Sequence, residues 1–389
     1  MKPLHMPEFR KMKRVATLLL PTVLLSMAVT LCSASIRRVG FFGIAVAGTD
    51  YSSFALAYNA AAPGDTILVF PGVAALNQVF TKKLIVIGPG NWLNPVSTPK
   101  GNADLQAFPL ESQVSVLTFN AGSDGTVVMG FQGGTYYVST SNITIRRNRD
   151  LTVYMAYPSG NSMSNLQVLE NYKVYIGNYY TGNSAVTNMN VSNNLIDRFT
   201  TATGNTYTGN VSNNVWAYDA TLPAATNGGS TTQSTAITVD LGNGVYLLQN
   251  NIFASYTSAT VAASSNYFAF SNASNSVFNY NLALNTNAPP VWPAGTGNVV
   301  TPISNYSSIF SAWPAIGSSS ADARYQLNAG SPALTVGAGG TPIGMFAGTT
   351  PYKLGTIPSI PTIYQLGSPQ GNNPTGNTIQ INLSTRGNN

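Results

Sequence analysis

The chain has 389 residues, of which 44% are hydrophobic and only 8% are charged. Globular chains carry about 25% charged residues. Here Asn, Ser, Thr, Gly and Tyr supply most of the polarity, a mixture that suits strands and turns better than helices. The net charge is +6, but 13 basic and 11 acidic residues remain when the first 34 residues are left out. We therefore expect no basic face and no nucleic-acid partner.

Residues 1–34 have the pattern of a secretory signal peptide. Five basic residues accompany an apolar run from Val15 to Leu31, and small residues follow at Ser33 and Ala34. The pattern predicts a secreted or cell-surface protein with no membrane span after cleavage. A single membrane anchor is an alternative, although Pro21 interrupts a run that is barely long enough to span a bilayer.

The sequence contains almost no cysteine or histidine. Cys32 is the only cysteine and His5 the only histidine. The predicted mature chain therefore has no disulfide, no thiol nucleophile, no imidazole base and no His/Cys metal site. We expect no cofactor, and lipid attachment at Cys32 is left open.

One short helix and then strands are predicted after the leader. Asp50 can cap a helix that carries Phe54, Tyr58 and Ala61 on one face, and Pro63-Gly64 ends it. Short β-branched runs at 66–70 and 83–87 end in Pro and Gly, as strands do. A helix that covers the first open coil of a β-solenoid fits this order.

A degenerate repeat occupies the middle of the chain. An apolar alternation ends repeatedly in Asn, at positions 148, 171, 194, 214, 251 and 281. The first three intervals are 23, 23 and 20 residues, the length of one rung of a parallel β-helix. The two longer intervals fit a rung with an added loop such as residues 222–235.

A structural role explains these asparagines. A tight turn between strands needs a residue that tolerates the left-handed conformation, and Asn does so at low cost. In a solenoid each turn lies about 4.8 Å from the previous one, so that stacked amides can hydrogen-bond along the axis. The sequence thus predicts an all-β parallel β-helix over residues 35–350, followed by a Pro/Gly/Asn-rich tail over 351–389 with a last strand near 379–384.

Two segments carry a resemblance to a known superfamily. Residues 61–72, AAPGDTILVFPG, and 82–90, KKLIVIGPG, resemble the opening of pectate-lyase-like right-handed parallel β-helix proteins. Residues 331–346 are similar to the closing segment of secreted β-helix proteins of Bacteroidetes, with Pro342 where Asp is usual. The resemblance covers roughly residues 50–366 and implies a right-handed solenoid with an N-terminal capping helix. It does not imply one activity, because this superfamily holds lyases, hydrolases, adhesins and inert surface proteins.

Charged residues are concentrated in one part of the repeat. A polysaccharide lyase needs an Arg or Lys base and usually carboxylates that hold calcium, whereas a hydrolase needs neighbouring carboxylates. The chain has no Asp-Asp pair. Eight charges do gather in the rungs from 146 to 198: Arg146, Arg147, Arg149, Asp150, Glu170, Lys173, Asp197 and Arg198. Their positions relative to the repeat Asn predict one patch, which is either a lyase-like site or an alternating ladder of surface ion pairs.

Tyrosines crowd the same rungs. They are Tyr136, Tyr137, Tyr154, Tyr157, Tyr172, Tyr175, Tyr179 and Tyr180. An exposed row could stack on sugar rings, and Tyr154, Tyr172, Tyr175 and Tyr179 are the candidates for glycan binding. Packing between neighbouring strands is the alternative.

Three functions are compatible with these patterns. The first is a non-enzymatic secreted or cell-surface protein, glycan-binding or adhesive, whose charge patch is paired within itself. The second is a carbohydrate-active enzyme on an acidic polysaccharide, a lyase before a hydrolase, with Arg146, Arg149, Asp150, Glu170, Lys173 and Asp197 as catalytic candidates and calcium as its cofactor. The third is a structural filament or sheath subunit.

Overall fold

The computed structural model describes residues 34–40, 46–93, 110–158, 160–179, 184–217, 237–254, 268–285, 292–302, 306–311, 320–367 and 382–387. The predicted leader with Cys32, Tyr180 and the loop 222–235 lie outside these residues. The chain divides into Met1–Ser35 and Ile36–Asn389, and the fold below is that of the second unit.

Nearly all of its strands belong to two long parallel sheets, which we call sheet A and sheet B, each with 12 strands among the described residues. Sheet A consists of β1 (Ile36–Val39), β2 (Asp50–Tyr51), β3 (Thr66–Val69), β5 (Ile85–Ile87), β7 (Val127–Met129), β9 (Thr144–Arg146), β11 (Ser162–Ser164), β12 (Gln167–Leu169), β14 (Ala185–Ser192), β16 (Thr206–Ser212), β19 (Val245–Gln249) and β22 (Val277–Asn279). Sheet B consists of β4 (Leu76–Phe80), β6 (Val114–Phe119), β8 (Thr135–Val138), β10 (Arg149–Met155), β13 (Tyr172–Asn178), β15 (Leu195–Thr200), β17 (Val215–Ala217), β18 (Ile237–Asp240), β20 (Ile252–Ala254), β21 (Phe268–Ser271), β23 (Leu282–Asn285) and β24 (Val299–Pro302).

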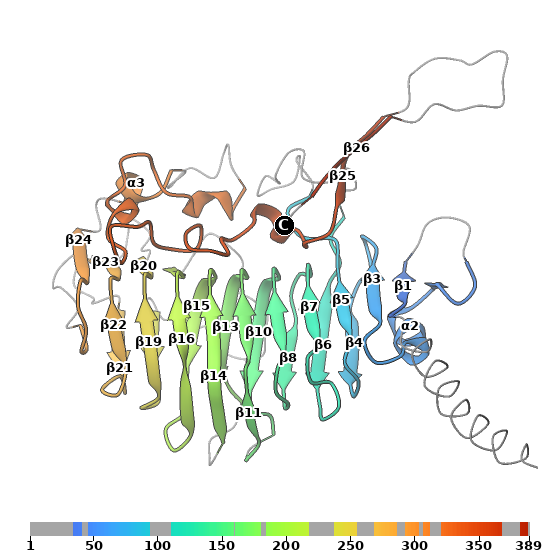
Figure 1. Ribbon diagram of the computed structural model, residues 1–389, viewed down its shortest axis with the longest axis horizontal. Helices are drawn as coiled ribbons and strands as arrows, with labels where there is room; N and C mark the ends of the chain where they lie inside the picture. The colour runs from blue at the N-terminus through green and yellow to red at the C-terminus, as the bar shows by residue number, and fades with distance from the viewer. Residues whose placement is uncertain are drawn as a thin grey trace, which may run out of the picture. The chain divides into compact units, whose positions relative to one another are not determined.

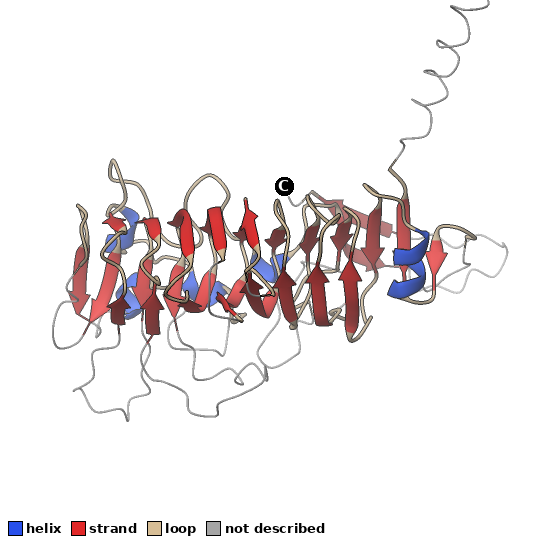
Figure 2. Cartoon of the chain, turned by 90° about the horizontal axis from the view of Figure 1, so that it is seen from below, coloured by secondary structure: helices blue, strands red, loops and turns tan. Residues whose placement is uncertain are grey.

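From β3 onward the chain passes back and forth between the two sheets. Each strand pairs with the strand one rung later in its own sheet, so that β9 pairs with β12 and β10 with β13. Figures 1 and 2 show the strands of both sheets following one another along the unit, with few and short helices between them. The all-β prediction is confirmed, and the arrangement is consistent with a parallel β-helix. We use "rung" for one such passage through both sheets.

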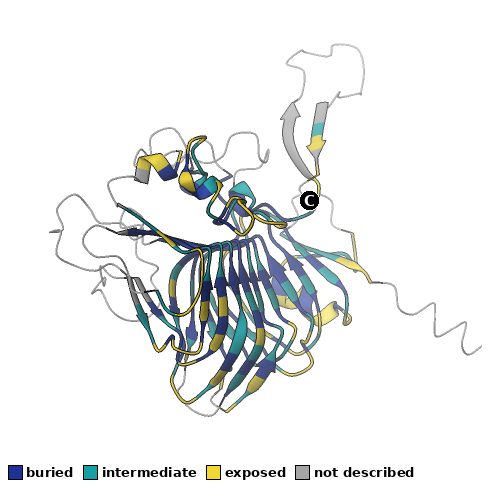
Figure 3. Cartoon of the chain, turned by 60° about the vertical axis from the view of Figure 1, so that its left-hand side comes forward, coloured by how far each residue is buried: buried dark blue, intermediate teal, exposed yellow. Residues whose placement is uncertain are grey.

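Alternating side chains form the interior. In sheet A the inward position is occupied by one buried apolar residue on each rung: Ile67, Val86, Val128, Ile145, Val168, Val191, Val211, Leu248 and Phe278. Because side chains alternate across a strand, the flanking residues of each strand point outward. Figure 3 shows buried stretches along the strands, with exposed residues both within the strands and at the loops.

A ladder of asparagine amides closes the corner after sheet A. Asn148, Asn171 and Asn194 are fully buried, and in each pair the later Oδ1 accepts the backbone N–H of the earlier Asn at 2.8–2.9 Å. The ladder continues through Asn214, Asn251 and Asn281 to Asn298. Each Nδ2 also donates to a backbone carbonyl, such as that of Ile145 from Asn171. The side chains thus satisfy turn groups that would otherwise be buried without a partner.

The predicted stacking is therefore confirmed, but the predicted backbone role of the ladder asparagines is wrong. The left-handed conformation falls one residue earlier, on Arg147, Glu170, Asn193, Asn213, Asn250 and Tyr280. The ladder Asn itself contributes its buried amide instead. In each turn, one residue adopts the positive φ and the following Asn makes the hydrogen bonds.

Aromatic side chains fill both ends of the interior. Helix α2 (Phe54–Ala60) places Phe54 and Tyr58 against Phe80, which stacks on Phe119 at 5.1 Å between ring centroids. Ser53 caps this helix by accepting the Leu56 N–H. The predicted cap, Asp50, instead pairs with Arg38 at 2.6 Å.

Phe253, Phe270, Phe278 and Trp292 contact one another toward the other end of the rungs. The interior is thus occupied by large rings at its first and last described rungs.

The segment 320–360, which we call the strap, runs back along the corner that holds the asparagine ladder (Figure 1). It includes the short 3-10 helices η2 (Ala323–Tyr325), η3 (Pro332–Leu334) and η4 (Leu354–Thr356), and follows helix α3 (Tyr306–Ile309). Gly344 N–H donates to Asn250 O, Asn193 Nδ2 to Met345 O, and Arg147 to Ile357 O.

Beneath the strap lies a second hydrophobic core. The rungs contribute mainly the residue that follows each ladder Asn: Tyr172, Leu195, Val215, Ile252 and Leu282. Beyond the strap, β25 (Thr362–Gly367) and β26 (Asn382–Arg386) pair antiparallel in a sheet of their own. Strand β26 overlaps the region of the predicted last strand, whose residues 379–381 lie outside the described residues, and it joins neither long sheet.

Candidate functional site

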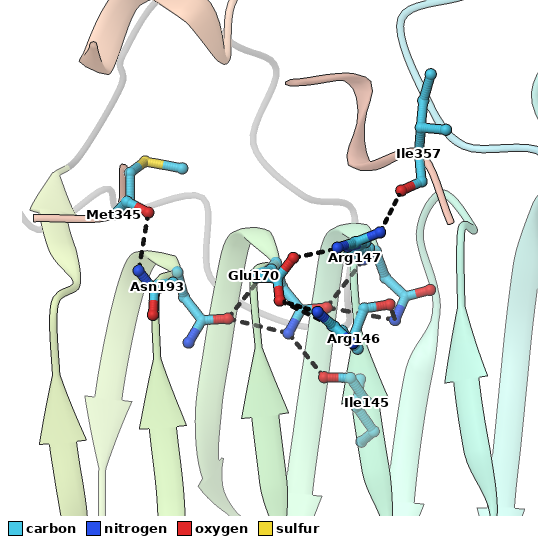
Figure 4. A network of polar contacts seen from close by, with 10 residues as sticks. Ile145, Arg146, Arg147, Glu170, Asn193, Met345 and Ile357 are labelled. Carbon is cyan, nitrogen blue, oxygen red and sulfur yellow. Dashed lines mark hydrogen bonds and ion pairs between the residues drawn. The ribbon is translucent and has the colours of Figure 1, made fainter. Parts of the chain in front are cut away.

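The charged residues of the 146–198 region form two groups on either side of the asparagine ladder. The first group is Arg146, Arg147 and Glu170, immediately before Asn148 and Asn171 in the chain (Figure 4). Arg147 Nε lies 2.6 Å from Glu170 Oε2, and Arg146 Nε lies 2.8 Å from Oε1 of the same carboxylate. The left-handed turn directs Arg147 and Glu170 toward the strap, where Arg147 also donates to Ile357 O at 2.9 Å.

Burial dominates the electrostatics of this first group. The side chains of Arg147 and Glu170 are each only 1% exposed. Burial lowers the pKa of Arg147 from its usual value, and the neighbouring Glu170 carboxylate opposes that shift. Both oxygens of Glu170 are used by arginines, so this group is a buried ion-pair network that joins two rungs to the strap.

The second group follows the ladder and centres on Arg149. Its guanidinium lies 3.1 Å from both Glu111 Oε1 and Asp150 Oδ2, and 4.7 Å from the ring centroid of Trp92. Trp92 N–H in turn donates to Glu111. These contacts hold the two segments that flank residues 94–109 against the rungs.

Asp150, Lys173 and Asp197 extend the second group across three rungs, as the sequence predicts. Asp150 and Lys173 share the same position after the ladder Asn, and both have positive φ. Val174 is opposite Ile196 and Tyr175 opposite Arg198, so Asp197 is the extra residue of a bulge. Burial raises the pKa of Asp197, while Lys173 and Arg198 lower it and Asp150 raises it. The three side chains therefore lie close enough to interact electrostatically.

Five tyrosines gather on the outward face of sheet B and the loops that leave it. We call Tyr137, Tyr154, Tyr157, Tyr175 and Tyr179 the tyrosine cluster. Their ring centroids lie 4.5–5.8 Å apart in six contacts. Tyr179 is 48% exposed, and the other four are half-buried.

The backbone register explains the cluster. Tyr137 and Tyr154 are paired on β8 and β10, and their rings stack at 5.5 Å. Gly177 follows opposite Tyr154 on β13, and a Cβ there would lie 2.6 Å from the Tyr175 hydroxyl. Glycine at 177 thus leaves room for the Tyr175 ring, over which the Arg198 guanidinium lies at 5.5 Å.

Two tyrosines of the region do not belong to the cluster. Tyr136 points inward from β8, and Tyr172 points into the second core, where its ring contacts Trp92 at 4.6 Å and Tyr325 at 6.3 Å. Tyr172 is 0% exposed, so it presents no face to a sugar and the expectation that it binds glycan is corrected. Tyr154, Tyr175 and Tyr179 remain candidates.

Sequence reasoning missed Glu111, the strap and the burial of Arg147. One signal was available: the residue after each ladder Asn is apolar or aromatic from Tyr172 onward. An outward apolar row of this kind needs a covering layer, and the strap supplies it.

Comparisons with models of protein families, with curated proteins and with solved structures find no match to this chain. Within the described residues, no group of three or more His, Cys, Asp and Glu side chains is placed to hold a metal ion. Over the same part of the chain, no helix has the length and apolar character needed to cross a bilayer.

Proposed function

We propose that this protein is a secreted or cell-surface, non-enzymatic right-handed parallel β-helix that binds a glycan through its tyrosine cluster. The observation that carries the proposal is the gathering of five tyrosines from neighbouring rungs on the outward face of sheet B around the half-exposed Tyr179. Helix α2 acts as the N-terminal cap of the solenoid. The pectate-lyase-like character of the opening residues supports this architecture.

Ring geometry indicates how a sugar would be bound. The faces of Tyr137 and Tyr154 are turned toward each other, with an angle of 21° between the planes. Tyr179 lies 5.6 and 5.1 Å from these two rings and nearly perpendicular to both, so it lies beside the stack. Tyr179 is therefore the ring on which a sugar stacks, while its neighbours offer ring edges and hydroxyl groups.

The surrounding charges support a binding role rather than catalysis. Glu170 is held by two arginines and Asp150 by Arg149. Asp197 lies beside Lys173 and Arg198. These carboxylates also fit calcium poorly, since each one faces a cation and calcium requires six to eight oxygen ligands.

A glycan-array screen of the purified protein, followed by titration of the best ligand, tests the proposal. Tyr179→Ala should weaken binding by about tenfold, because loss of one aromatic contact of about 1.4 kcal/mol has that effect. Tyr280→Ala, at a half-buried tyrosine of a distant rung, is the control and should bind normally. Equal affinity of Tyr179→Ala and the native protein would refute the proposed site.

A polysaccharide lyase is the second candidate, favoured by the placement of Lys173 beside the half-buried Asp197. A lyase needs a base next to a group that carries or accepts a proton. Ultraviolet absorbance of unsaturated products from acidic polysaccharides tests it. Product formation that is lost in Lys173→Ala would replace the binding proposal. Absence of product from every acidic polysaccharide tested would exclude the lyase.

A further inference from the structure

The tyrosine cluster has a second chemical property, which does not depend on glycan binding. Phenol rings in contact can be joined covalently after one-electron oxidation. Tyr137 and Tyr157 have the nearest centroids, at 4.5 Å, and Tyr179 lies 5.6 Å from each of them. Tyr179 is also the exposed member, so an oxidant in solution reaches it first.

Competing oxidation targets are scarce in the described residues. Cys32, outside them, is the only cysteine of the chain, so no thiol competes within the solenoid. The methionines there, at 129, 155, 163, 189 and 345, are all buried, with at most 8% exposure. Oxidation in solution should therefore be directed to surface tyrosines, where it meets three rings in mutual contact.

We propose that Tyr137, Tyr157 and Tyr179 form an oxidative cross-linking site, in which a peroxidase with hydrogen peroxide joins two of them as dityrosine. Each phenol gives up one hydrogen atom, and the two radicals combine through ring carbons next to the oxygens. Those two carbons lose their protons, and the oxygens regain them. The two hydrogen atoms lost reduce one peroxide to two waters.

The link would tie rungs together in a chain whose predicted mature part cannot form a disulfide. Tyr137 is on β8, Tyr157 follows β10 and Tyr179 follows β13. Any two of them therefore belong to different rungs. A cross-link that closes a loop between rungs restricts the unfolded chain and should raise the melting temperature.

The sequence permits a direct test by mass spectrometry. Trypsin cleaves after Arg146, Arg149, Lys173 and Arg198, so Tyr137, Tyr157 and Tyr179 fall on three different peptides. After treatment of the purified protein with peroxidase and peroxide, we expect blue dityrosine fluorescence and a pair of joined peptides that has lost two hydrogens. The product should run as a single chain on a denaturing gel at every protein concentration.

Phenylalanine variants identify the residues without removing their rings. Tyr157→Phe and Tyr179→Phe should each lower the fluorescence, because each removes two of the three possible couplings. The double variant Tyr157→Phe/Tyr179→Phe should lose most of it, and the control Tyr280→Phe should keep it. Melting curves check that the variants are folded. Undiminished fluorescence in both variants, cross-links only between chains, or addition of oxygen instead of coupling would overturn the proposal. Glycan binding is measured separately, so failure of either proposal leaves the other standing.

Discussion

The rungs between residues 137 and 198 have two differently built surfaces. At the corner with the asparagine ladder, polar groups are buried, paired with one another and covered by the strap. On the outward face of sheet B, the tyrosine cluster contacts itself and leaves Tyr179 half exposed. Part of the charged region, Arg147 and Glu170, thus lies buried beneath the strap, whereas the tyrosine-rich region exposes Tyr179 at the surface.

Substitution of Tyr172 and of Tyr179 compares the two surfaces with the same residue type. Tyr172→Ala removes a fully buried ring from the second core and should lower the free energy of unfolding by about 3–5 kcal/mol. Tyr179→Ala removes a half-exposed ring and should cost less than about 1 kcal/mol. Denaturant unfolding of both variants measures these two losses. Equal losses in the free energy of unfolding would contradict the difference between the two surfaces.

Disruption of the buried ion pair between Arg147 and Glu170 should destabilise the protein nearly as much. Glu170→Ala leaves Arg147 charged, buried and without its carboxylate, and the expected loss is about 3–5 kcal/mol. Asp150→Asn is the control, because Asn tolerates the positive φ of this residue and Arg149 keeps Glu111, so that the expected loss stays under about 1 kcal/mol. The double variant Arg147→Met/Glu170→Leu should recover much of the stability lost in Glu170→Ala. If Glu170→Ala lowered the free energy of unfolding no more than the control does, the pair would not link the rungs to the strap.

Removal of a ladder amide should have the next largest effect on the free energy of unfolding. Asn171→Ala removes the acceptor of the Asn148 N–H and a donor to the Ile145 carbonyl, and it should cost about 2–4 kcal/mol. Asn190, on the outward face of sheet A, donates through its side-chain Nδ2 to Gln167 Oε1 and is only partly buried. Asn190→Ala is therefore the control and should cost less than about 1 kcal/mol. Comparable melting temperatures for the two variants would argue against a buried ladder.

Substitution of Asp197 should have the smallest effect on stability. Because burial raises its pKa above the ordinary 3.8, the folded state binds the proton more readily than the unfolded state. Stability should then fall as pH rises from about 3.8 through the raised pKa, and Asp197→Asn should flatten this dependence. We expect the variant to melt slightly higher than the native protein at neutral pH. A lower melting temperature there would show that attraction to Lys173 and Arg198 outweighs desolvation.

The sequence predicted the all-β class, the early strands and the asparagine ladder, because these depend on local period and on repetition at 20–23 residues. It did not predict which side of the corner each charge occupies. Arg146 and Glu170 precede the ladder Asn, whereas Arg149 and Asp150 follow it, and the turn sends the two sets to different surroundings. The burial of Arg147 and Tyr172 depends on the strap, which lies about 150–210 residues further along the chain. Local pattern carries no information about such a contact.

Glycan retention by a matched pair of variants tests the central claim that the tyrosine cluster, and not the charged corner, is the binding surface. The native protein, Tyr179→Ala and Arg146→Ala would be titrated with the best ligand from the array. We expect Arg146→Ala to bind as the native protein does and Tyr179→Ala to bind about tenfold more weakly. Loss of binding in Arg146→Ala with full binding in Tyr179→Ala would contradict it.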